Sequence, residues 1–494
     1  MQLLSMLKLL FDLKNRTFIP TIGLEIHVQL ATKSKIFCED ATKFDADSNT
    51  QIGIISLAYP GALPKLNKEV VEMAVKVGLA LNSEIASQVV FDRKHYFYPD
   101  SPKGYQLTQN TLPICKGGAI ELELPNGKIK KVYFHQIHLE DDAGKSIHEP
   151  NSDFTLIDLN RAGMPLIEMV TNPNLSSAEE VGVLLEEVRK IVRFLGVSDG
   201  NMEQGSLRCD ANISIRLNES EPLGKKVEIK NMNSIRFIKK AIDYEIERQS
   251  ELLANGIAVE QESRLFDADK GITLGMRDKE DANDYRYYPD PDLVPFEIKD
   301  DWLSGVKANM PKLPKQLKSE FILKYGLTTY DASVLSDSLF LSSQFIHLME
   351  ANAAPKRTAN WLMGPVQAWF KEQTTEPRNL PITSLSKAIN WVEEGKLTSA
   401  QGIQQLLPAL LNNYELNIEQ FAQQNNLFLS ADTDELLDEI ISVLDKYNEE
   451  VKRYKQGKKG LLQLFVGKVM GATKSKYDPK QVIKKIQEML NKTS

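Results

Sequence analysis

The segment Ile22-Gly23-Leu24-Glu25-Ile26-His27-Val28-Gln29-Leu30 has the alternation of a β-strand with two unlike faces. Successive side chains of a strand point to opposite sides, so residues 22, 24, 26, 28 and 30 place only aliphatic side chains on one face. The other face carries Glu25, His27 and Gln29. A strand of this kind buries its apolar side and leaves its polar side open, which predicts a mostly antiparallel sheet.

Four further segments repeat this pattern and carry acids, amides, an imidazole or cations on their second face. These second-face residues are Arg208, Asp210 and Asn212; His138 and Glu140; Asp158 and Asn160; and Glu228 and Lys230. One interpretation is that the polar face of the sheet is simply solvated. The alternative is a metal site, because Glu140-Asp141-Asp142 places three carboxylates together that repel one another unless water or a cation screens them. Oxygen ligands with one imidazole favour magnesium or manganese over structural zinc.

The chain of 494 residues is long enough for roughly two to four domains. Residues 1–20 are predicted to be an N-terminal extension, and residues 21–309 a strand-rich cradle domain interrupted by two amphipathic helices, at about 177–195 and 234–254. The first helix has Ser176 and Glu179 at capping-box spacing. We expect a helical domain at 310–425 and a small helical tail domain at 426–494, which together make an α+β protein.

The tail has a charge opposite to that of the whole chain. The net charge is −7, yet residues 451–494 hold twelve Lys and Arg against Asp478 and Glu488. This bias fits contact with a polyanion, and it also fits a solvated helical surface. Three scattered cysteines indicate a reducing cytoplasm rather than a disulfide framework, and no apolar stretch reaches the ~20 residues of a membrane span.

Two other segments have a composition that suits binding of an anion such as a phosphate. Residues 92–106 mix Arg and Lys with aromatic residues, as a site for phosphates and base stacking does, although a packed aromatic loop has the same composition. Asn231, Asn233 and Arg236 precede or open the second helix and suit an anion or ordinary capping. The sequence contains no GxxxxGK[ST] loop, no GxSxG elbow and no Gly-Gly-Ser-Ser amidase run. If the chain takes part in amide chemistry, a partner would therefore have to supply the nitrogen.

Seven motifs in one order resemble the B-type subunit of the aspartyl/glutamyl-tRNA amidotransferase family. They are residues 23–30 (GLEIHVQL), 92–106, 138–145 (HLEDDAGK), 158–168 (DLNRAGMPLIE), 207–212 (LRCDAN), 228–234 (EIKNMNS) and 286–293 (RYYPDPDL). The resemblance runs from about residue 21 to the C-terminus, where residues 466–470 (VGKVM) resemble the end of the family's tRNA-contacting tail.

The resemblance implies an ATP- and Mg²⁺-dependent enzyme subunit. It would phosphorylate the side-chain carboxylate of Glu-tRNA(Gln), Asp-tRNA(Asn) or both, and then amidate it. Ammonia would come from an amidase-type glutaminase subunit in a heterotrimer that also contains a third, small subunit. The remaining alternatives are a non-catalytic tRNA-binding scaffold and a stand-alone ligase that uses free ammonia.

Site residues follow from the same resemblance, position by position. Glu25, His27, Glu140 and Asp141 look like the magnesium cluster, which Asp210 is placed to complete from a facing strand. Lys94 looks similar to the family's lysine near the ammonia outlet. Contacts with phosphate or substrate are expected from Arg208, Lys230 and Asn231. The family commonly has Glu-Glu-Asp where this chain has Glu140-Asp141-Asp142, so direct ligation by the shorter Asp141 side chain is in question.

Overall fold

The computed structural model describes residues 18–148, 153–276, 285–373, 378–430, 433–473 and 476–492. The chain forms two compact units, Met1–Leu313 and Pro314–Ser494. The first contains the described strands and the second is helical, which confirms the α+β class. Most of the predicted extension at residues 1–20 lies outside the described residues, and the first strand begins at Ile19.

A ten-stranded sheet is the framework of the first unit. In spatial order its strands are β15 (Ile272–Gly275), β14 (Glu262–Asp267), β13 (Val227–Lys230), β12 (Leu207–Arg216), β1 (Ile19–Gln29), β11 (Pro165–Thr171), β8 (Ile129–Asp141), β6 (Cys115–Lys116) and β2 (Glu84–Ile85), with β7 (Ala119–Glu123) also paired to β8. Only β13 and β14 run parallel among these pairs, so the predicted antiparallel character is confirmed.

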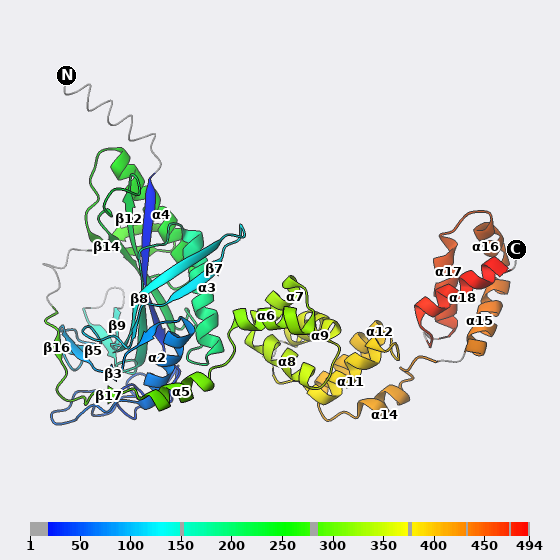
Figure 1. Cartoon of the computed structure of the whole chain (residues 1–494), viewed down its shortest axis with the longest axis horizontal. Helices are drawn as coiled ribbons and strands as arrows, with labels where there is room; N and C mark the ends of the chain where they lie inside the picture. The colour runs from blue at the N-terminus through cyan, green and yellow to red at the C-terminus, as the bar shows by residue number, and fades with distance from the viewer. Residues whose placement is uncertain are drawn as a thin grey trace, which may run out of the picture. The chain divides into compact units, whose positions relative to one another are not determined.

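Helices cover the apolar face of this sheet. Ile22, Leu24, Ile26 and Val28 are at most 1% exposed and share one hydrophobic core with α2 (Lys68–Ala80), α3 (Ala178–Phe194) and α4 (Ile235–Ala254). Figure 1 shows α3 and α4 lying alongside the long central strands. The last helix of the unit is α5 (Asp300–Ala308), which packs on the same core through Trp302.

The two helices predicted within the sheet domain are confirmed, but one predicted cap is wrong. Ser177, not Ser176, caps α3 by accepting a hydrogen bond from the Glu180 backbone N–H. The Glu180 carboxylate in turn accepts from the backbone N–H of Ser176, so the capping interactions are shifted by one residue. The prediction that two helices alone interrupt the strands is also wrong, because α2 is a third.

Three small sheets complete the first unit. The strands β16 (Tyr288–Pro289), β4 (Asp92–His95) and β5 (Tyr105–Thr108) form one of them, and β9 (Lys145–His148) pairs with β10 (Thr155–Asp158) in the second. The third consists of β3 (Gln88–Val89) and β17 (Phe296–Glu297). The aromatic-cation segment 92–106 therefore forms a hairpin to which residues 288–289 add a strand.

The second unit is built from short helices. Its first part contains α6 (Pro314–Tyr325), α7 (Thr329–Ser336), α8 (Leu339–Glu350), α9 (Pro355–Trp361), η1 (Leu362–Val366), α10 (Gln367–Glu372), α11 (Ile382–Glu393), α12 (Ser399–Gln401), η2 (Gly402–Leu406), α13 (Leu407–Asn412) and α14 (Ile418–Gln424). The helices α15 (Thr433–Lys446), α16 (Asn448–Lys455), α17 (Leu461–Ala472) and α18 (Pro479–Lys492) follow and enclose a hydrophobic cluster of their own. The predicted boundary at 425/426 falls between α14 and α15 and stays a prediction.

Candidate functional site

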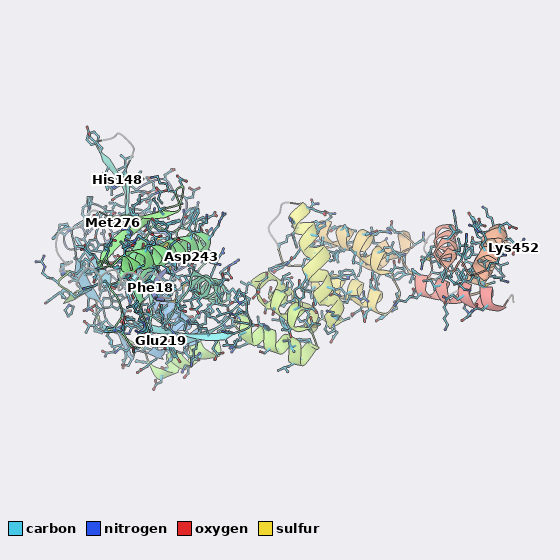
Figure 2. The ribbon with its side chains drawn as sticks, turned by 90° about the horizontal axis from the view of Figure 1, so that it is seen from above. Phe18, His148, Glu219, Asp243, Met276 and Lys452 are labelled. Carbon is cyan, nitrogen blue, oxygen red and sulfur yellow. The ribbon has the colours of Figure 1, made fainter. Side chains whose placement is uncertain are left out.

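The polar face of the ten-stranded sheet is the floor of a cavity of about 990 Å³. Strands β1, β8, β11, β12, β13 and β14 each contribute polar side chains to it, and residues of the β16–β4–β5 sheet and the segment before it line another side. Met276, labelled in Figure 2, lines the cavity where β15 ends. The sheet therefore separates an apolar side, under the helices, from a polar chamber.

Strand register brings the central polar residues into one row. Glu168 on β11 lies directly opposite His27 on β1 and opposite His138 on β8. His27 in turn lies opposite Arg208 on β12. Directly opposite residues in antiparallel strands have Cβ atoms only about 5 Å apart, so four side chains from four strands meet here.

The carboxylate of Glu168 bridges the two imidazoles of this row. Its Oε2 is 3.1 Å from His138 Nε2 and 3.4 Å from His27 Nε2. Glu140 joins from the same strand as His138, with Oε1 3.5 Å from His27 Nε2. One ligand atom each from His27, Glu140 and Glu168 lie within 4.8 Å of one another, which is compact enough to surround a single metal ion.

Burial and charge strongly perturb the pKa values of this cluster. Burial acts to lower the pKa of His27, but the hydrogen bond to Glu168 and the charge of Glu140 outweigh it and raise the pKa to about 9. Burial acts to raise the pKa of Glu168, yet its hydrogen bonds with His138 and His27 hold that pKa well below its usual range. The pKa of Glu140 is raised, chiefly by burial and then by the charge of Glu168 against the opposing effect of His27.

A second row of polar residues lies beside the first. Glu25 on β1 is opposite Asp210 on β12, and the β12–β13 register continues the row to Lys230. Lys230 Nζ is 2.9 Å from Asp210 Oδ2 and 2.8 Å from Glu228 Oε1. Burial and the neighbouring charges of Glu168 and Glu228 raise the pKa of Glu25, so this carboxylate is poorly compensated.

Cations approach the rows from two sides. Arg208 lines the cavity and its Nη2 is 2.8 Å from Asp142 Oδ2, which fixes the guanidinium. Lys94, from β4, lines the cavity and lies with Nζ 4.6 Å from the centroid of the Tyr285 ring. These cations and the carboxylate-imidazole cluster therefore face the same space.

Seven of the nine residues expected from the sequence line this cavity. They are Glu25, His27, Lys94, Glu140, Arg208, Asp210 and Lys230. Asp141 does not join them: its carboxylate is paired with Lys103 Nζ and accepts a 2.7 Å hydrogen bond from the Leu107 backbone N–H. Asn231 is exposed, with a backbone φ of +66°, and is not among the cavity-lining residues. The acidic run is thus split, because its central residue points away from the cavity.

Glu168 is absent from the site residues expected from the sequence, and His138 is expected only as part of a polar strand face. Both belong to the central cluster. His138 shares the alternation of Glu140, so the strand pattern alone identifies it. Glu168 is the sole charged residue of β11, which is an otherwise apolar or neutral segment, and that isolation was the available signal.

Comparison with known proteins shows the family of this chain. Residues 20–304 match the family model described as GatB/GatE catalytic domain, and residues 343–490 match the one described as GatB domain. The B-type subunit of the aspartyl/glutamyl-tRNA(Asn/Gln) amidotransferase of Thermodesulfovibrio yellowstonii is 43% identical over 471 residues, covering 95% of this chain and 98% of that protein. The protein of the same name from Thioalkalivibrio sulfidiphilus is 44% identical over 464 residues, 93% of this chain and 97% of that one. The chain belongs to the GatB family of aspartyl/glutamyl-tRNA(Asn/Gln) amidotransferase subunits.

In this member of the GatB family, the matched catalytic domain contains every described residue that lines the cavity. Each helix among the described residues is too short or too polar to cross a bilayer.

The charges of the cavity fit a divalent cation. Among the described lining residues, carboxylates outnumber Lys and Arg seven to four: Glu25, Glu140, Asp142, Glu168, Asp210, Glu228 and Glu262 against Lys94, Arg208, Lys226 and Lys230. The pKa of Glu140 is raised chiefly by burial, and a further positive charge beside it would favour its ionised form. A hard cation held by His27, Glu140 and Glu168 would supply the missing positive charge, and carboxylate oxygens suit magnesium or manganese. His138, on the far side of Glu168, would then orient that ligand.

Proposed function

We propose that this chain is the activating subunit of a tRNA-dependent amidotransferase. It uses ATP to phosphorylate the side-chain carboxylate of Glu-tRNA(Gln), Asp-tRNA(Asn) or both, after which ammonia displaces the phosphate. The relatives' name supports the substrate class. The observation that carries the proposal is the convergence of His27, Glu140 and Glu168 on the floor of a cavity large enough for a nucleotide.

The chemistry explains why such a site is needed. A carboxylate is a poor electrophile because its negative charge repels a nucleophile, and phosphorylation turns it into an acyl phosphate with a good leaving group. Phosphoryl transfer depends mainly on positioning and on positive charge around the phosphates. Mg²⁺ bound to His27, Glu140 and Glu168 would supply part of that charge.

The cations of the cavity would hold the two anionic substrates. Arg208 is fixed by Asp142 and Lys230 by Asp210 and Glu228, so each presents its remaining N–H groups in a defined direction. We assign them to phosphate oxygens or the substrate carboxylate. Lys94, on β4 of the small sheet, also lines the cavity and would contact the same groups.

The nitrogen source would be a partner. The sequence lacks an amidase-type Gly-Gly-Ser-Ser run, so we assign glutamine hydrolysis to an amidase-type glutaminase subunit, in a heterotrimer completed by a third, small subunit. The basic C-terminal helices would contact the tRNA, whose phosphates attract Lys and Arg. The complex would work in the cytoplasm.

The decisive experiment purifies the chain with its partner subunits and measures amidation of Glu-tRNA(Gln) and Asp-tRNA(Asn) with ATP and Mg²⁺. We expect His27→Ala and Glu168→Gln to lower the amidation rate by at least 100-fold, equivalent to about 2.7 kcal/mol. The loss should be the same with ammonium chloride as with glutamine, because activation precedes amidation. Glu187→Gln is the matched control, since Glu187 lies on α3 in a partly exposed pair with Lys190.

The same assay separates the alternatives. A non-catalytic scaffold requires unchanged amidation in both site variants with tRNA binding retained. A stand-alone ligase requires that the isolated chain amidates with ammonium salts at the rate of the full complex. Activity of the isolated chain with glutamine as sole nitrogen donor would contradict the assigned partner.

A further inference from the structure

Two tyrosines form one edge of the cavity. Tyr285 and Tyr287 line it, and they are its only phenol rings among the described lining residues. Tyr287 is 42% exposed although it borders a chamber of mostly charged and amide side chains. A partly exposed aromatic ring at the edge of a polar cavity offers apolar surface that a flat ligand group can cover.

The segment that carries these tyrosines is firmly anchored. Tyr288 pairs with Arg93 in the small sheet, and the guanidinium of Arg93 binds Asp290 at 2.6 Å and Asp292 at 2.7 Å. The Asp290 side chain is fully buried. The tyrosine edge is therefore held in place before any ligand arrives, which lowers the entropy lost on binding.

Hydrogen bonds from the backbone and the side chain of His95 add to this anchoring. The His95 backbone N–H donates to the Tyr285 carbonyl at 2.9 Å, and His95 Nδ1 is 2.9 Å from the Arg286 carbonyl. Tyr288, by contrast, is 57% exposed and is not among the cavity-lining residues. Tyr288 belongs to β16, whereas Tyr287 precedes this strand and borders the cavity.

The rings form a connected edge next to a cation. Tyr285 and Tyr287 have centroids 6.3 Å apart and nearly perpendicular planes, with an interplanar angle of 70°. Tyr96 also packs against Tyr285, with ring centroids 6.3 Å apart. The ammonium of Lys94 lies over Tyr285, 4.6 Å from its centroid, so a phosphate bound by Lys94 would lie beside the tyrosine edge.

We propose that Tyr287, supported by Tyr285, is the stacking platform for an adenine base. This inference rests on the proposed function, whose substrates supply adenine from two sources: ATP itself and the 3′-terminal adenosine of the tRNA. In either case the base stacks on Tyr287 while the charged part of the ligand extends toward Lys94 and the carboxylate-imidazole cluster. Stacking on an aromatic ring suits a base whose edges are not read by hydrogen bonds.

The first test uses the full chain and two probes, Mg·ATP and Mg·tripolyphosphate, which differ by the nucleoside. Isothermal titration calorimetry should show that Tyr287→Leu raises the Kd for Mg·ATP about tenfold and leaves the Kd for Mg·tripolyphosphate unchanged. Tyr287→Phe should keep the affinity of the unmodified chain, because the ring remains. Tyr288→Leu is the matched control and should change neither Kd.

The second test asks whether the base belongs to the tRNA. The probes are tRNA(Gln) ending in its terminal adenosine and the same tRNA lacking that nucleotide. If the platform takes the tRNA base, Tyr287→Leu weakens binding of the complete tRNA, leaves binding of the shortened one unchanged, and does not affect Mg·ATP. Either pattern supports the adenine platform and identifies its source.

The outcomes also separate this inference from the proposed function. If the unmodified chain binds Mg·ATP and tRNA, but Tyr287→Leu changes neither, the platform is refuted and the proposed function stands. Equal weakening of Mg·ATP and Mg·tripolyphosphate likewise refutes base stacking. If the unmodified chain binds neither nucleotide nor tRNA, the proposed function fails and the platform with it.

Discussion

The bridge from Glu168 to two imidazoles predicts that the metal-free protein loses stability as pH rises. The pKa of His27 is raised from 6.5 to about 9 by Glu168 and Glu140, against the effect of burial. Because the folded pKa exceeds the unfolded one, the protonated imidazole stabilises the fold fully below pH ~6.5. That stabilisation is lost as pH rises through 9. At about 1.4 kcal/mol per pKa unit, the loss is about 3 kcal/mol in the free energy of unfolding.

The assay needs a reporter in the first unit alone. Trp302 packs on the core of that unit, while Trp361, Trp369 and Trp391 belong to the second. A background with these three replaced by Phe therefore reports on the first unit by fluorescence. Urea unfolding in EDTA, at pH 6 and at pH 9.5, gives the two free energies by linear extrapolation.

Glu168→Gln isolates the contribution of the bridge. Gln keeps the size of the side chain but removes the charge, so the difference in stability between pH 6 and pH 9.5 should fall to less than half of the original one. Glu187→Gln, a surface change on α3, should keep the full difference. If Glu168→Gln shows the same pH dependence as the unmodified chain, the electrostatic account of this cluster is wrong.

Three further predictions concern the framework of the first unit and use the same urea assay. Glu245→Ala should lower the free energy of unfolding by about 3 kcal/mol, because the fully buried carboxylate pairs with two arginines. Gly78→Ala should cost about 1–3 kcal/mol, since an added Cβ would lie 2.4 Å from Cys115 Sγ. Ser177→Ala should cost about 1 kcal/mol by leaving the backbone N–H of Glu180 without its side-chain acceptor.

Strand alternation is the part of the site that sequence predicts well. Ile22, Leu24 and Ile26 are buried against helices, while Glu25 and His27 face the cavity, as a period of two requires. The signal is local and each strand carries it independently. The polar residues of such a face can therefore be predicted from one strand alone, without knowledge of which strands lie beside it.

The acidic run obeys the same alternation, and this removes Asp141 from the expected metal cluster. Glu140 and Asp141 are adjacent in β8, so their side chains point to opposite sides, and only Glu140 reaches the cluster. The expectation that both bind the metal rests on the closeness of the carboxylates in sequence and on the family resemblance, and neither takes the pleat of the strand into account. Asp142, just beyond the strand, returns to the cavity side and binds Arg208.

Long-range register is the information that the sequence does not carry. Glu168 reaches the cluster only because β11 lies between β1 and β8. Its partners His27 and His138 are 141 and 30 positions away from it in the sequence. Nothing local to β11 specifies these neighbours. The helix α2 escaped prediction for a local reason: it is rich in valine, a β-branched residue that favours strands.

The charge excess of the cavity has a consequence for the order of binding under the proposed function. ATP and the aminoacyl carboxylate are both anions, and the lining carboxylates outnumber the Lys and Arg side chains. Arg208 and Lys230 are already partly neutralised by their own carboxylates, so their attraction for phosphate is weakened. Bound Mg²⁺ would therefore provide most of the attraction, and ATP should bind measurably only in its presence. On this reasoning, loss of Glu168 should weaken Mg·ATP binding more than loss of Arg208 does, even though only Arg208 carries a charge opposite to that of phosphate.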